Sequence, residues 1–350
     1  TDAEIRNVTV TDADDNAVRI AGVGASVTDV FVRNPSSDGI QVQSGGTNAT
    51  VRNNTVSAAL GAGFDVHGVN ATVRNNTVVA VLGVGFDVHG GNSTFRNNTV
   101  TSASGDGFDI SGDDVALRNN TIRSADGHGL HVRPGAVGVT LRGDVFVDDT
   151  FTTFLAESRV SATAITLNGT TVSVTARDVE LLPVADLVNT PDGFVDLDAF
   201  FRAAAQSEDA YADLTLSYAR PGPDVVESKT AVWTLDLGDG WSGPVPSTLD
   251  AANDTVSANL TDFSTVAALA PRDLSGEEVL DCRVIDSPGT YSLAISLENR
   301  TADPCIDIQS DDVVFDGRGE SIRGGPGTTG VRVGTSGDGA YENVTVRNVT

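Results

Sequence analysis

The sequence predicts an all-β protein in three parts: a parallel β-helix, a β-sandwich-like domain, and the start of a second β-helix. Three observations lead to this prediction. A 22-residue repeat recurs without gaps, and each repeat alternates apolar and polar residues with the period of a strand. In the middle of the chain the repeat ends and the sequence pattern changes.

The repeat is clearest between residues 48 and 135. Its four units are NATVRNNTVSAALGAGFDVHGV, NATVRNNTVVAVLGVGFDVHGG, NSTFRNNTVTSASGDGFDISGD and DVALRNNTIRSADGHGLHVRPG. A period of about 20 residues is typical of a solenoid, in which one unit cannot bury its apolar face without stacked neighbours.

Within a unit, the segments T-V-R-N and F-D-V-H alternate apolar and polar residues, and glycines separate them as turns. No segment of the block carries the apolar stripe of a helix. Each unit also holds an Arg-Asn-Asn step, first at Arg52–Asn54. Asparagine tolerates a tight bend, and stacked amides can hydrogen-bond along a column. These features predict a parallel β-helix with an asparagine ladder, and they leave open which asparagine of each pair faces inward.

The first β-helix is predicted at residues 1–150. Ile5–Thr9 resembles the later Arg-Asn-Asn-Thr steps, and no capping segment precedes it, so the first coil is expected to start open. The repeat decays at Leu141–Asp144, where the asparagine pair is lost, and the run from Phe146 leaves the register. We therefore expect about six coils with a length of roughly 30 Å.

Residues 151–271 are predicted to form the β-sandwich-like domain, with antiparallel strands. The candidate strands are Ala164–Ala176, Ala212–Ala219, Ala231–Leu237, Thr255–Leu260 and Ser264–Ala270. A turn at Leu237–Gly240 predicts a hairpin.

One short helix is predicted in this domain, at Leu197–Ala205, after a turn at Pro191–Gly193 and with Asp196 as its cap. The aromatic residues predicted as the core of the domain, rather than as a platform for sugars, are Trp233, Trp241 and Phe263.

Residues 272–350 return to coil-like segments and are predicted to open a second β-helix. Cys282 and Cys305 lie 23 residues apart, close to the length of one coil. Since stacked coils lie about 4.7–4.9 Å apart, the two cysteines are predicted to form a disulfide, with two free thiols as the alternative. A disulfide indicates an oxidising, extracellular environment.

Two stretches resemble archaeal cell-surface proteins. The segments TPDGF, LDAFF, YADLTLSY, PSTLD and NDTVSANLTDFSTVA, together with Trp241, resemble a β-sandwich module of such proteins. The segments DCRVIDSPGTY, PCIDI and VVFDGRG resemble the opening coils of archaeal β-helix surface proteins, which are related to the β-helix protein of nitrous oxide reductase maturation. The resemblance implies a right-handed parallel β-helix in a long exported chain. It would also suggest copper handling, but the absence of methionine and the scattered histidines argue against that.

The chain is strongly acidic, with 48 Asp and Glu residues against 22 Lys and Arg residues and a net charge of −26. Nucleic acid is an unfavourable partner, because phosphate binding needs a basic patch and none is visible in the sequence. Lys229 is the single lysine. An acidic, lysine-poor composition is typical of halophilic archaea, whose surface carboxylates are screened in molar salt. An acidic secreted protein from a marine mesophile is the alternative.

The sequence also predicts export and N-linked glycans. No methionine, signal peptide or apolar span is present, which favours a mature or internal segment. The Asn-x-Ser/Thr sites best placed for glycans, on outer turns or in the middle domain, are Asn48, Asn70, Asn92, Asn168, Asn253, Asn259 and Asn299.

The strongest candidate site is one outward strand face of the first β-helix. Its predicted ligand-binding residues are Asp65, His67, Asp87, His89, Asp109 and His131. Stacked acids about 4.8 Å apart repel one another by roughly 1 kcal/mol per adjacent pair in water, so salt, the histidines or a divalent cation should offset the repulsion.

Three interpretations of this face compete. It binds a cation or sugar hydroxyls; it cleaves polysaccharide, with Asp87 as base and His89 as acid; or it is the polar side of a duplicated strand and has no chemistry. The interpretation without chemistry is favoured, because the acids recur with the repeat, whereas the residues of an active site usually interrupt a repeat. No catalytic residue or resident cofactor is therefore assigned.

The sequence thus predicts an exported, glycosylated structural component of the cell surface or of an extracellular filament of a halophilic archaeon. Its expected partners are copies of itself or flanking β-helix modules joined end to end. The alternative is a carbohydrate-active β-helix protein, such as a polysaccharide lyase, a hydrolase or a sugar-binding adhesin that contacts cell-surface polysaccharide.

Overall fold

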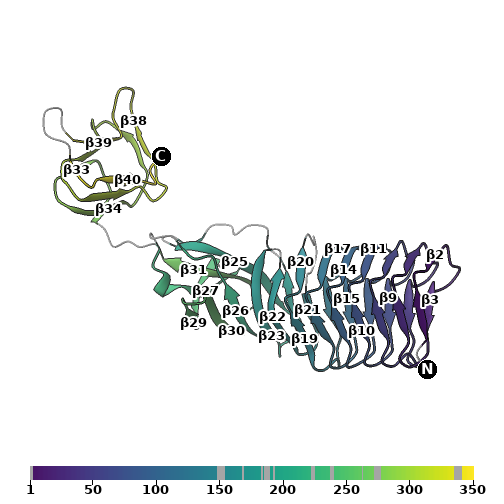
Figure 1. Cartoon of the computed structure of the whole chain (residues 1–350). Coiled ribbons are helices and arrows are strands. Elements are labelled where there is room, and N and C mark those ends of the chain that lie inside the picture. Colours follow the sequence, from purple (N-terminus) through teal and green to yellow (C-terminus); the bar gives the residue numbers. More distant parts are fainter. Residues whose placement is uncertain are drawn as a thin grey trace. The chain divides into compact units, whose positions relative to one another are not determined.

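A computed structural model describes residues 3–147, 154–167, 169–182, 184, 190–191, 194–221, 225–236, 240–261, 263–271, 277–334 and 341–350. The chain divides into two compact units (Figure 1). The first unit comprises residues 1–221 and 227–271, and the second comprises residues 222–226 and 272–350. Across the described ranges, the helical structure is limited to the 3-10 turn η1 (Glu227–Lys229), and no helix could cross a membrane.

Each coil of the first unit contributes one strand to a sheet that we call sheet B and two strands to a sheet that we call sheet A. The parallel strands of sheet B are β3 (Val18–Ile20), β6 (Ile40–Val42), β9 (Phe64–Val66), β12 (Phe86–Val88), β15 (Phe108–Ile110), β18 (Leu130–Val132) and β21 (Phe154–Ala156). The first row of sheet A holds β1 (Glu4–Arg6), β4 (Ser26–Thr28), β7 (Thr50–Arg52), β10 (Thr72–Arg74), β13 (Thr94–Arg96), β16 (Ala116–Arg118) and β19 (Val139–Arg142). The second row holds β2 (Thr9–Thr11), β5 (Phe31–Arg33), β8 (Thr55–Ser57), β11 (Thr77–Val81), β14 (Thr99–Ala103), β17 (Thr121–Ala125) and β20 (Val145–Val147).

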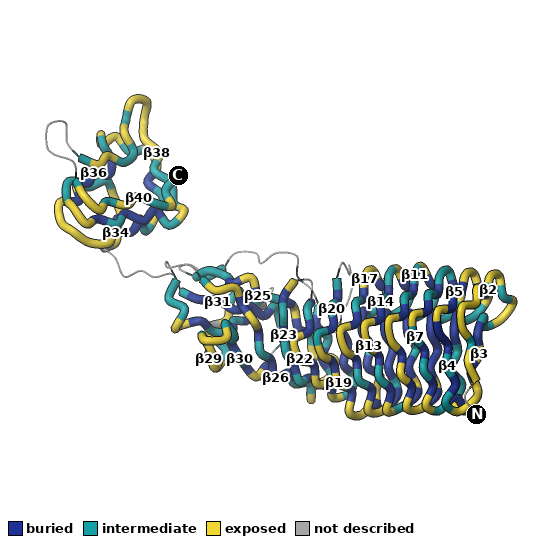
Figure 2. Tube along the Cα trace, viewed as in Figure 1, coloured by how far each residue is buried: buried dark blue, intermediate teal, exposed yellow. Residues whose placement is uncertain are grey.

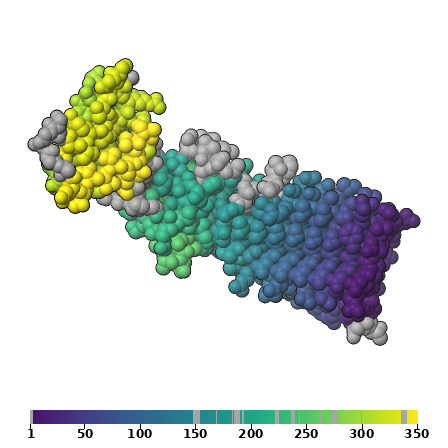
Figure 3. Space-filling model, turned by 45° about the horizontal axis from the view of Figure 1, so that its top comes forward, coloured from purple at the N-terminus to yellow at the C-terminus, as the bar shows by residue number. Residues whose placement is uncertain are grey.

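Successive coils pair in parallel and in register, so that each residue lies beside its counterpart in the next repeat. Figure 3 shows the coils of this unit as closely packed successive bands. The predicted parallel β-helix is therefore confirmed. Sheet B contributes one strand from each of seven described coils, against the six coils predicted.

The core consists of columns of identical or similar apolar residues. Figure 2 shows that buried positions recur from coil to coil. Phe64, Phe86 and Phe108 stack with ring centroids 4.8 and 4.6 Å apart, and all three are fully buried. Phe95 of sheet A packs edge-on against this column, 5.9 Å from Phe86 and 5.8 Å from Phe108. Close packing of these rings makes each coil depend on its neighbours.

The second asparagine of each Arg-Asn-Asn step forms the ladder, which the sequence left open. Asn54, Asn76, Asn98 and Asn120 are buried, and each amide nitrogen donates to the side-chain oxygen of the next coil at 2.8–3.0 Å. The first asparagine of each step is exposed and adopts a left-handed conformation, with φ between 54° and 56°. The first asparagine of each step thus forms the bend, and the second provides hydrogen bonds to buried backbone groups.

The stack continues beyond Leu141–Asp144, where the sequence repeat decays. Asp144 takes the next position of the ladder, accepting from Asn120 at 2.8 Å, and Phe146 is buried beside Ile122. Phe154 then pairs with Leu130. The prediction that the run from Phe146 leaves the register is therefore wrong for its described residues. The predicted boundary at residue 150 falls outside the described residues.

Both sheets pass directly from parallel coils to antiparallel strands. The hairpin of β22 (Val160–Leu167) and β23 (Thr170–Arg177) continues sheet A, and β22 also pairs in parallel with β19 and β20. The predicted strand Ala164–Ala176 is therefore two strands. The later strands of sheet A are β26 (Tyr211–Ser217), β29 (Ser247–Asp250) and β30 (Thr255–Leu260), and those of sheet B are β24 (Val179–Leu182), β25 (Phe194–Ala205), β27 (Ala231–Asp236), β28 (Gly240–Val245) and β31 (Thr265–Pro271).

The predicted helix Leu197–Ala205 is wrong, because this segment is part of strand β25. Leu197, Ala199 and Phe201 are buried while the intervening residues are exposed or half-buried, so the strand period governs this segment. Asp196 accepts a hydrogen bond from the backbone of Asp198 at 3.0 Å and does not cap a helix. Part of the predicted Pro191–Gly193 turn lies outside the described residues.

The other predictions for the antiparallel region are confirmed in part. The strands near 212, 231, 255 and 264 are present, and β27 pairs with β28 as the predicted hairpin, although most of its turn lies outside the described residues. The three aromatic residues are half-buried rather than core residues. Trp233 packs edge-on against Phe194, with centroids 4.7 Å apart.

The second unit is also a stack of parallel strands. Its strands are β32 (Glu277–Val279), β33 (Arg283–Ile285), β34 (Gly289–Leu293), β35 (Leu297–Arg300), β36 (Ile306–Ile308), β37 (Val313–Asp316), β38 (Ile322–Gly324), β39 (Val331–Val333) and β40 (Thr345–Arg347). They surround a core that includes Leu293, Ile306 and Phe315. Cys282 and Cys305, on adjacent coils with Cα atoms 4.5 Å apart, form the predicted disulfide.

Candidate ligand-binding face

The outward face of sheet B carries the predicted site residues in two columns. Asp65, Asp87, Asp109 and His131 occupy the middle positions of four consecutive strands and pair in register. His67 and His89 follow two residues later in their coils. We call this surface the sheet B face. Strand geometry explains it, because the residues between two inward phenylalanine and valine columns must point outward.

At the N-terminal side of the sheet B face, glutamines precede the acids. Gln41 pairs with Asp65 in register, and its amide donates to Asp65 Oδ2 at 2.8 Å. Asp65 is 8% exposed. Its Oδ1 atom lies 2.9 Å from His67 Nε2, but this contact lacks hydrogen-bond geometry, and the buried Oδ1 has no hydrogen-bond partner among the described residues.

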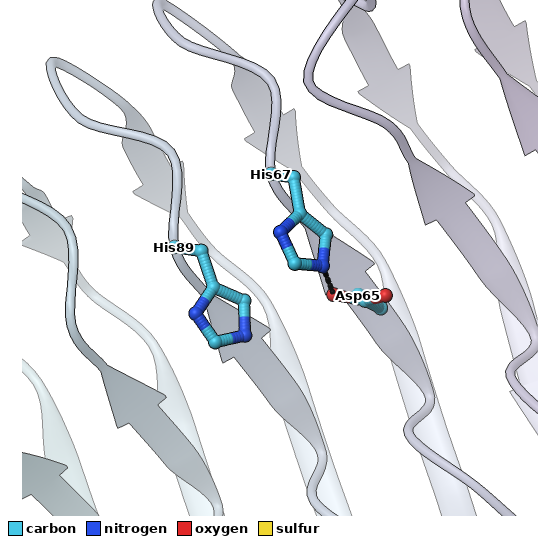
Figure 4. A group of neighbouring side chains, drawn as sticks. All are labelled: Asp65, His67 and His89. Carbon is cyan, nitrogen blue, oxygen red and sulfur yellow. Dashed lines mark ion pairs between the residues drawn. The ribbon is translucent and has the colours of Figure 1, made fainter.

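The two exposed histidines form a stacked pair on adjacent coils (Figure 4). The rings of His67 and His89 are 4.4 Å apart and inclined by 12°. His89 Nε2 lies 3.0 Å from Asp87 Oδ1, and its Nδ1 lies 2.8 Å from the hydroxyl of Ser111. The weak catalytic candidates Asp87 and His89 are therefore in contact with each other.

The C-terminal side of the face is more highly charged. Arg133 donates two hydrogen bonds to Asp109, which is 4% exposed. His131 lies between two carboxylates, with Nε2 2.7 Å from Glu157 and Nδ1 3.3 Å from Asp106. His128 Nδ1 contacts Asp106 at 3.1 Å. We call this set the charged cluster; its members are Asp106, Asp109, His128, His131, Arg133 and Glu157.

Comparison with known protein families identifies the repeat. Residues 2–172 match the model described as "Right handed beta helix region". The repeats are right-handed β-helix repeats. The handedness implied by the resemblance is therefore confirmed, whereas an archaeal origin and a sandwich module are not shown.

Several solved structures show a distant similarity to this β-helix protein. The siphovirus 9NA tailspike receptor-binding domain has 15% identity and a TM-score of 0.42, with 76% of this chain and 64% of that chain covered. A double-mutant tailspike of the Escherichia coli bacteriophage HK620, in complex with a pentasaccharide, has 10% identity, a TM-score of 0.34 and coverages of 77% and 69%. The Dettilon tailspike has 10% identity, a TM-score of 0.17 and coverages of 78% and 86%. No curated protein gave a match. Such low TM-scores say nothing about a shared function.

Within the charged cluster, hydrogen bonds shift the pKa values of Asp106 and His131 in opposite directions. Burial raises the pKa of Asp106, but hydrogen bonds from His128 and His131 outweigh it and hold that pKa well below the ordinary value. The hydrogen bond to Asp106 raises the pKa of His131, and Glu157 adds to this. An imidazole between two carboxylates donates from both nitrogens only when it is protonated, so the cluster favours the imidazolium form.

The charged cluster breaks the repeat, and the predicted site residues did not include four of its members, Asp106, His128, Arg133 and Glu157. Ala62, Val84, Asp106 and His128 occupy one position in successive 22-residue units. The change from small apolar residues to an acid and a histidine is visible in the alignment, but that column lies in a turn next to the strand. Glu157 lies after β21, beyond the last clear repeat, so no alignment points to it.

Two groups of side chains on the β-helix have the composition of a metal site. The ligand atoms of Asp65, His67 and His89 lie within 4.8 Å of one another, and those of Asp106, His128 and His131 do as well. Two imidazoles and a carboxylate, with an open fourth position, suit zinc. In the second group, protonated His131 would have to lose its proton before it could bind a metal.

The remaining predicted site residues lie elsewhere. Asn48, Asn70 and Asn92 are exposed on the turns of successive coils, and Asn253 and Asn259 are exposed in the antiparallel region. Asn168 and the side chain of Asn299 are outside the described residues. Exposure permits glycosylation, which stays a prediction.

Proposed function

We propose that this protein is an extracellular carbohydrate-binding β-helix protein whose sheet B face contacts the glycan, with the charged cluster at the C-terminal side of that face as the main contact. The single observation that carries the proposal is that the cluster departs from the repeat. Asp106 has a counterpart in Asp38, because each accepts a hydrogen bond from the backbone nitrogen of the next coil. Tandem duplication explains a column that recurs, but it does not explain His128 and Glu157 converging with Asp106 around His131.

The chemistry of the face suits sugar hydroxyl groups, which both donate and accept hydrogen bonds. Carboxylates accept, guanidinium donates, and imidazole does either according to its protonation. The side chains are already held by one another, as in the Arg133–Asp109 pair, so ligand binding would immobilise few additional rotamers. The disulfide of the second unit supports the extracellular location.

A divalent cation could also take part at the other end of the face. Asp65 Oδ1 is buried without a hydrogen-bond partner among the described residues, and His67 and His89 lie beside it. Such an unpaired oxygen is costly unless a ligand satisfies it. The cation predicted for the acidic column therefore belongs, in this proposal, at Asp65, His67 and His89.

An array of neutral and acidic oligosaccharides, probed with the purified chain in Zn²⁺ or in EDTA, tests the proposal. The double variant Asp106→Val, His128→Val restores the residue of the preceding coil, Val84, and should weaken glycan binding at least about tenfold. Arg123→Thr on sheet A, which copies Thr101 of the preceding coil, is the matched control and should bind like the wild type. Loss of binding in EDTA would support the cation.

The architectural role predicted from the repeats is the rival outcome of this experiment. If no glycan binds and electron microscopy shows filaments of the same protein, the chain is a structural component and the carbohydrate proposal is wrong. If wild type and both variants bind glycans equally, the ligand lies off the sheet B face. Release of shorter oligosaccharides would instead indicate an enzyme.

A further inference from the structure

A second charged surface lies on sheet A, and it is made of arginines. Each first-row strand from β7 to β19 ends on an outward arginine, and these residues pair in register from coil to coil. We call them the arginine row, and they are Arg52, Arg74, Arg96, Arg118 and Arg142. Arg52 is half-buried and the other four are exposed. The linear sequence does not show this basic patch because 22 or 24 residues separate its members.

The arginine row has no counter-charge within the described part of the chain. None of its guanidinium groups lies within ion-pair distance of a described carboxylate, whereas Arg19 contacts Asp15 at 3.0 Å and Arg133 contacts Asp109. The described strands of sheet A from β7 to β20 contain no Asp or Glu. The chain has 48 acidic residues, and none of them lies in these strands.

Stacking places the arginines about 4.8 Å apart, where two unit charges repel by roughly 1 kcal/mol in water. Five in a row span four such intervals, roughly 19 Å. A row of like charges without internal compensation is stabilised by an anion with several charges along its length. Small anions in solution screen the row, but a linear polyanion neutralises all five positions at once and releases their counterions.

We propose that the arginine row binds a linear, acidic polysaccharide that carries carboxylate or sulfate groups. Guanidinium groups form two parallel hydrogen bonds with such anions. The neighbouring outward positions are suited to sugar hydroxyls, since threonines such as Thr72 and Thr94 lie on one side and exposed asparagines such as Asn75 and Asn97 on the other.

A polysaccharide fits this surface better than a nucleic acid. The described outward positions from β7 to β20 of sheet A carry no aromatic side chain on which a base could stack. The arginine row belongs to a different sheet from the charged cluster, so this inference does not depend on the function proposed for the sheet B face.

Binding of the unglycosylated full chain to four probes tests the inference: heparin, polygalacturonate, neutral dextran and oligothymidylate. The variant Arg74→Thr, Arg96→Thr, Arg118→Thr copies Thr28, which occupies the same column in β4. We expect the wild type to bind heparin or polygalacturonate in a salt-dependent manner, and this variant to bind at least about tenfold more weakly.

The matched control removes three arginines from other positions. Arg19→Gln, Arg33→Ser, Arg123→Thr copies the residue of an adjacent coil at each position and gives the same net charge. It should keep the affinity of the wild type. If the triple variant at the row fails to fold, Arg96→Thr alone should still weaken binding measurably.

Several results would overturn the inference. Equal losses in the two triple variants would indicate a general charge effect, and binding to oligothymidylate as tight as to the polysaccharides would indicate a nucleic-acid surface. Absence of binding to both acidic polysaccharides would refute it directly. Self-association of the wild type that the row variant abolishes, without polysaccharide binding, would assign the row to an acidic face of a second copy.

Discussion

On the sheet B face the stacked acids each have a partner, whereas on sheet A the stacked arginines have none among the described residues. Asp65 contacts Gln41, Asp87 contacts His89, and Asp109 holds Arg133. Both columns arise from the same 22-residue repeat, which copies a charge every coil and so places like charges about 4.8 Å apart.

The difference shows where the β-helix departs from simple duplication. On sheet B, His89 belongs to the repeat, but the compensation at the two ends of the acidic column comes from residues that break it: Gln41 before the column, and Arg133 and Glu157 after it. On sheet A the row runs from Arg52 to Arg142 without such a substitution. Charges that are paired within the protein form a preorganised polar surface. A row of like charges without such partners favours the binding of a polyanion from outside the protein.

The largest expected effect comes from removing the compensation on sheet B. Arg133→Ser, which copies Ser111 of the preceding coil, leaves the carboxylate of Asp109 buried without its charged partner. We expect the free energy of unfolding to fall by about 3 kcal/mol, because the buried carboxylate of Asp109 loses two charge-assisted hydrogen bonds from a guanidinium group whose side chain is 51% exposed. Urea denaturation at neutral pH measures this. A loss no larger than that of an exposed surface substitution would show that solvent already hydrates Asp109.

A smaller effect is expected at the end of the asparagine ladder, where an acid replaces the neutral amide. Burial raises the pKa of Asp144 to about 6, although hydrogen bonds from Asn120 and Arg142 oppose this. The native state therefore binds the proton more tightly than the unfolded chain. The stability from this group is complete below pH 3.8, falls as the pH rises toward about 6, and is absent above it.

Asp144→Asn removes that pH dependence. We expect the variant to be roughly 2 kcal/mol more stable than the wild type at about pH 8, and the difference to vanish near about pH 4. Melting curves of both proteins across this range give the comparison. A constant difference at every pH would mean that the native carboxyl titrates normally.

The sequence predicts the repeated part of this molecule well, because a strict period places every side chain. Register, the phenylalanine column and the alignment of Asp65 with Asp87 all follow from a 22-residue spacing and strand alternation. The structure also shows features that a strict 22-residue period cannot predict. Leu130 and Phe154 are paired but lie 24 residues apart. Because this coil is longer than the 22-residue repeat, an alignment of the repeats does not show that the stack continues.

Local composition misled the prediction in the antiparallel region. The segment FFRAAA is rich in good helix formers, but Phe201 and Ala203 point into a core shared with β31 and β24, and packing overrides propensity. The arginine row was missed for a different reason. Neither the total charge nor any local motif shows that one arginine per coil becomes a continuous basic row.

The smallest effect separates the arginine row from an ordinary exposed arginine. Arg96 has an arginine above and below it, so Arg96→Thr relieves two repulsions of roughly 1 kcal/mol each at low salt. Solvent and side-chain freedom reduce this, and we expect a gain in stability of up to about 1 kcal/mol in dilute salt. The gain should fade in about 1 M NaCl, where the screening length is about 3 Å.

Arg123→Thr is the control, since its register partners are Thr101 and Val147 and it should show no salt-dependent gain. If Arg96→Thr instead lowers the stability, the guanidinium makes stabilising contacts of its own, and the row is compensated after all.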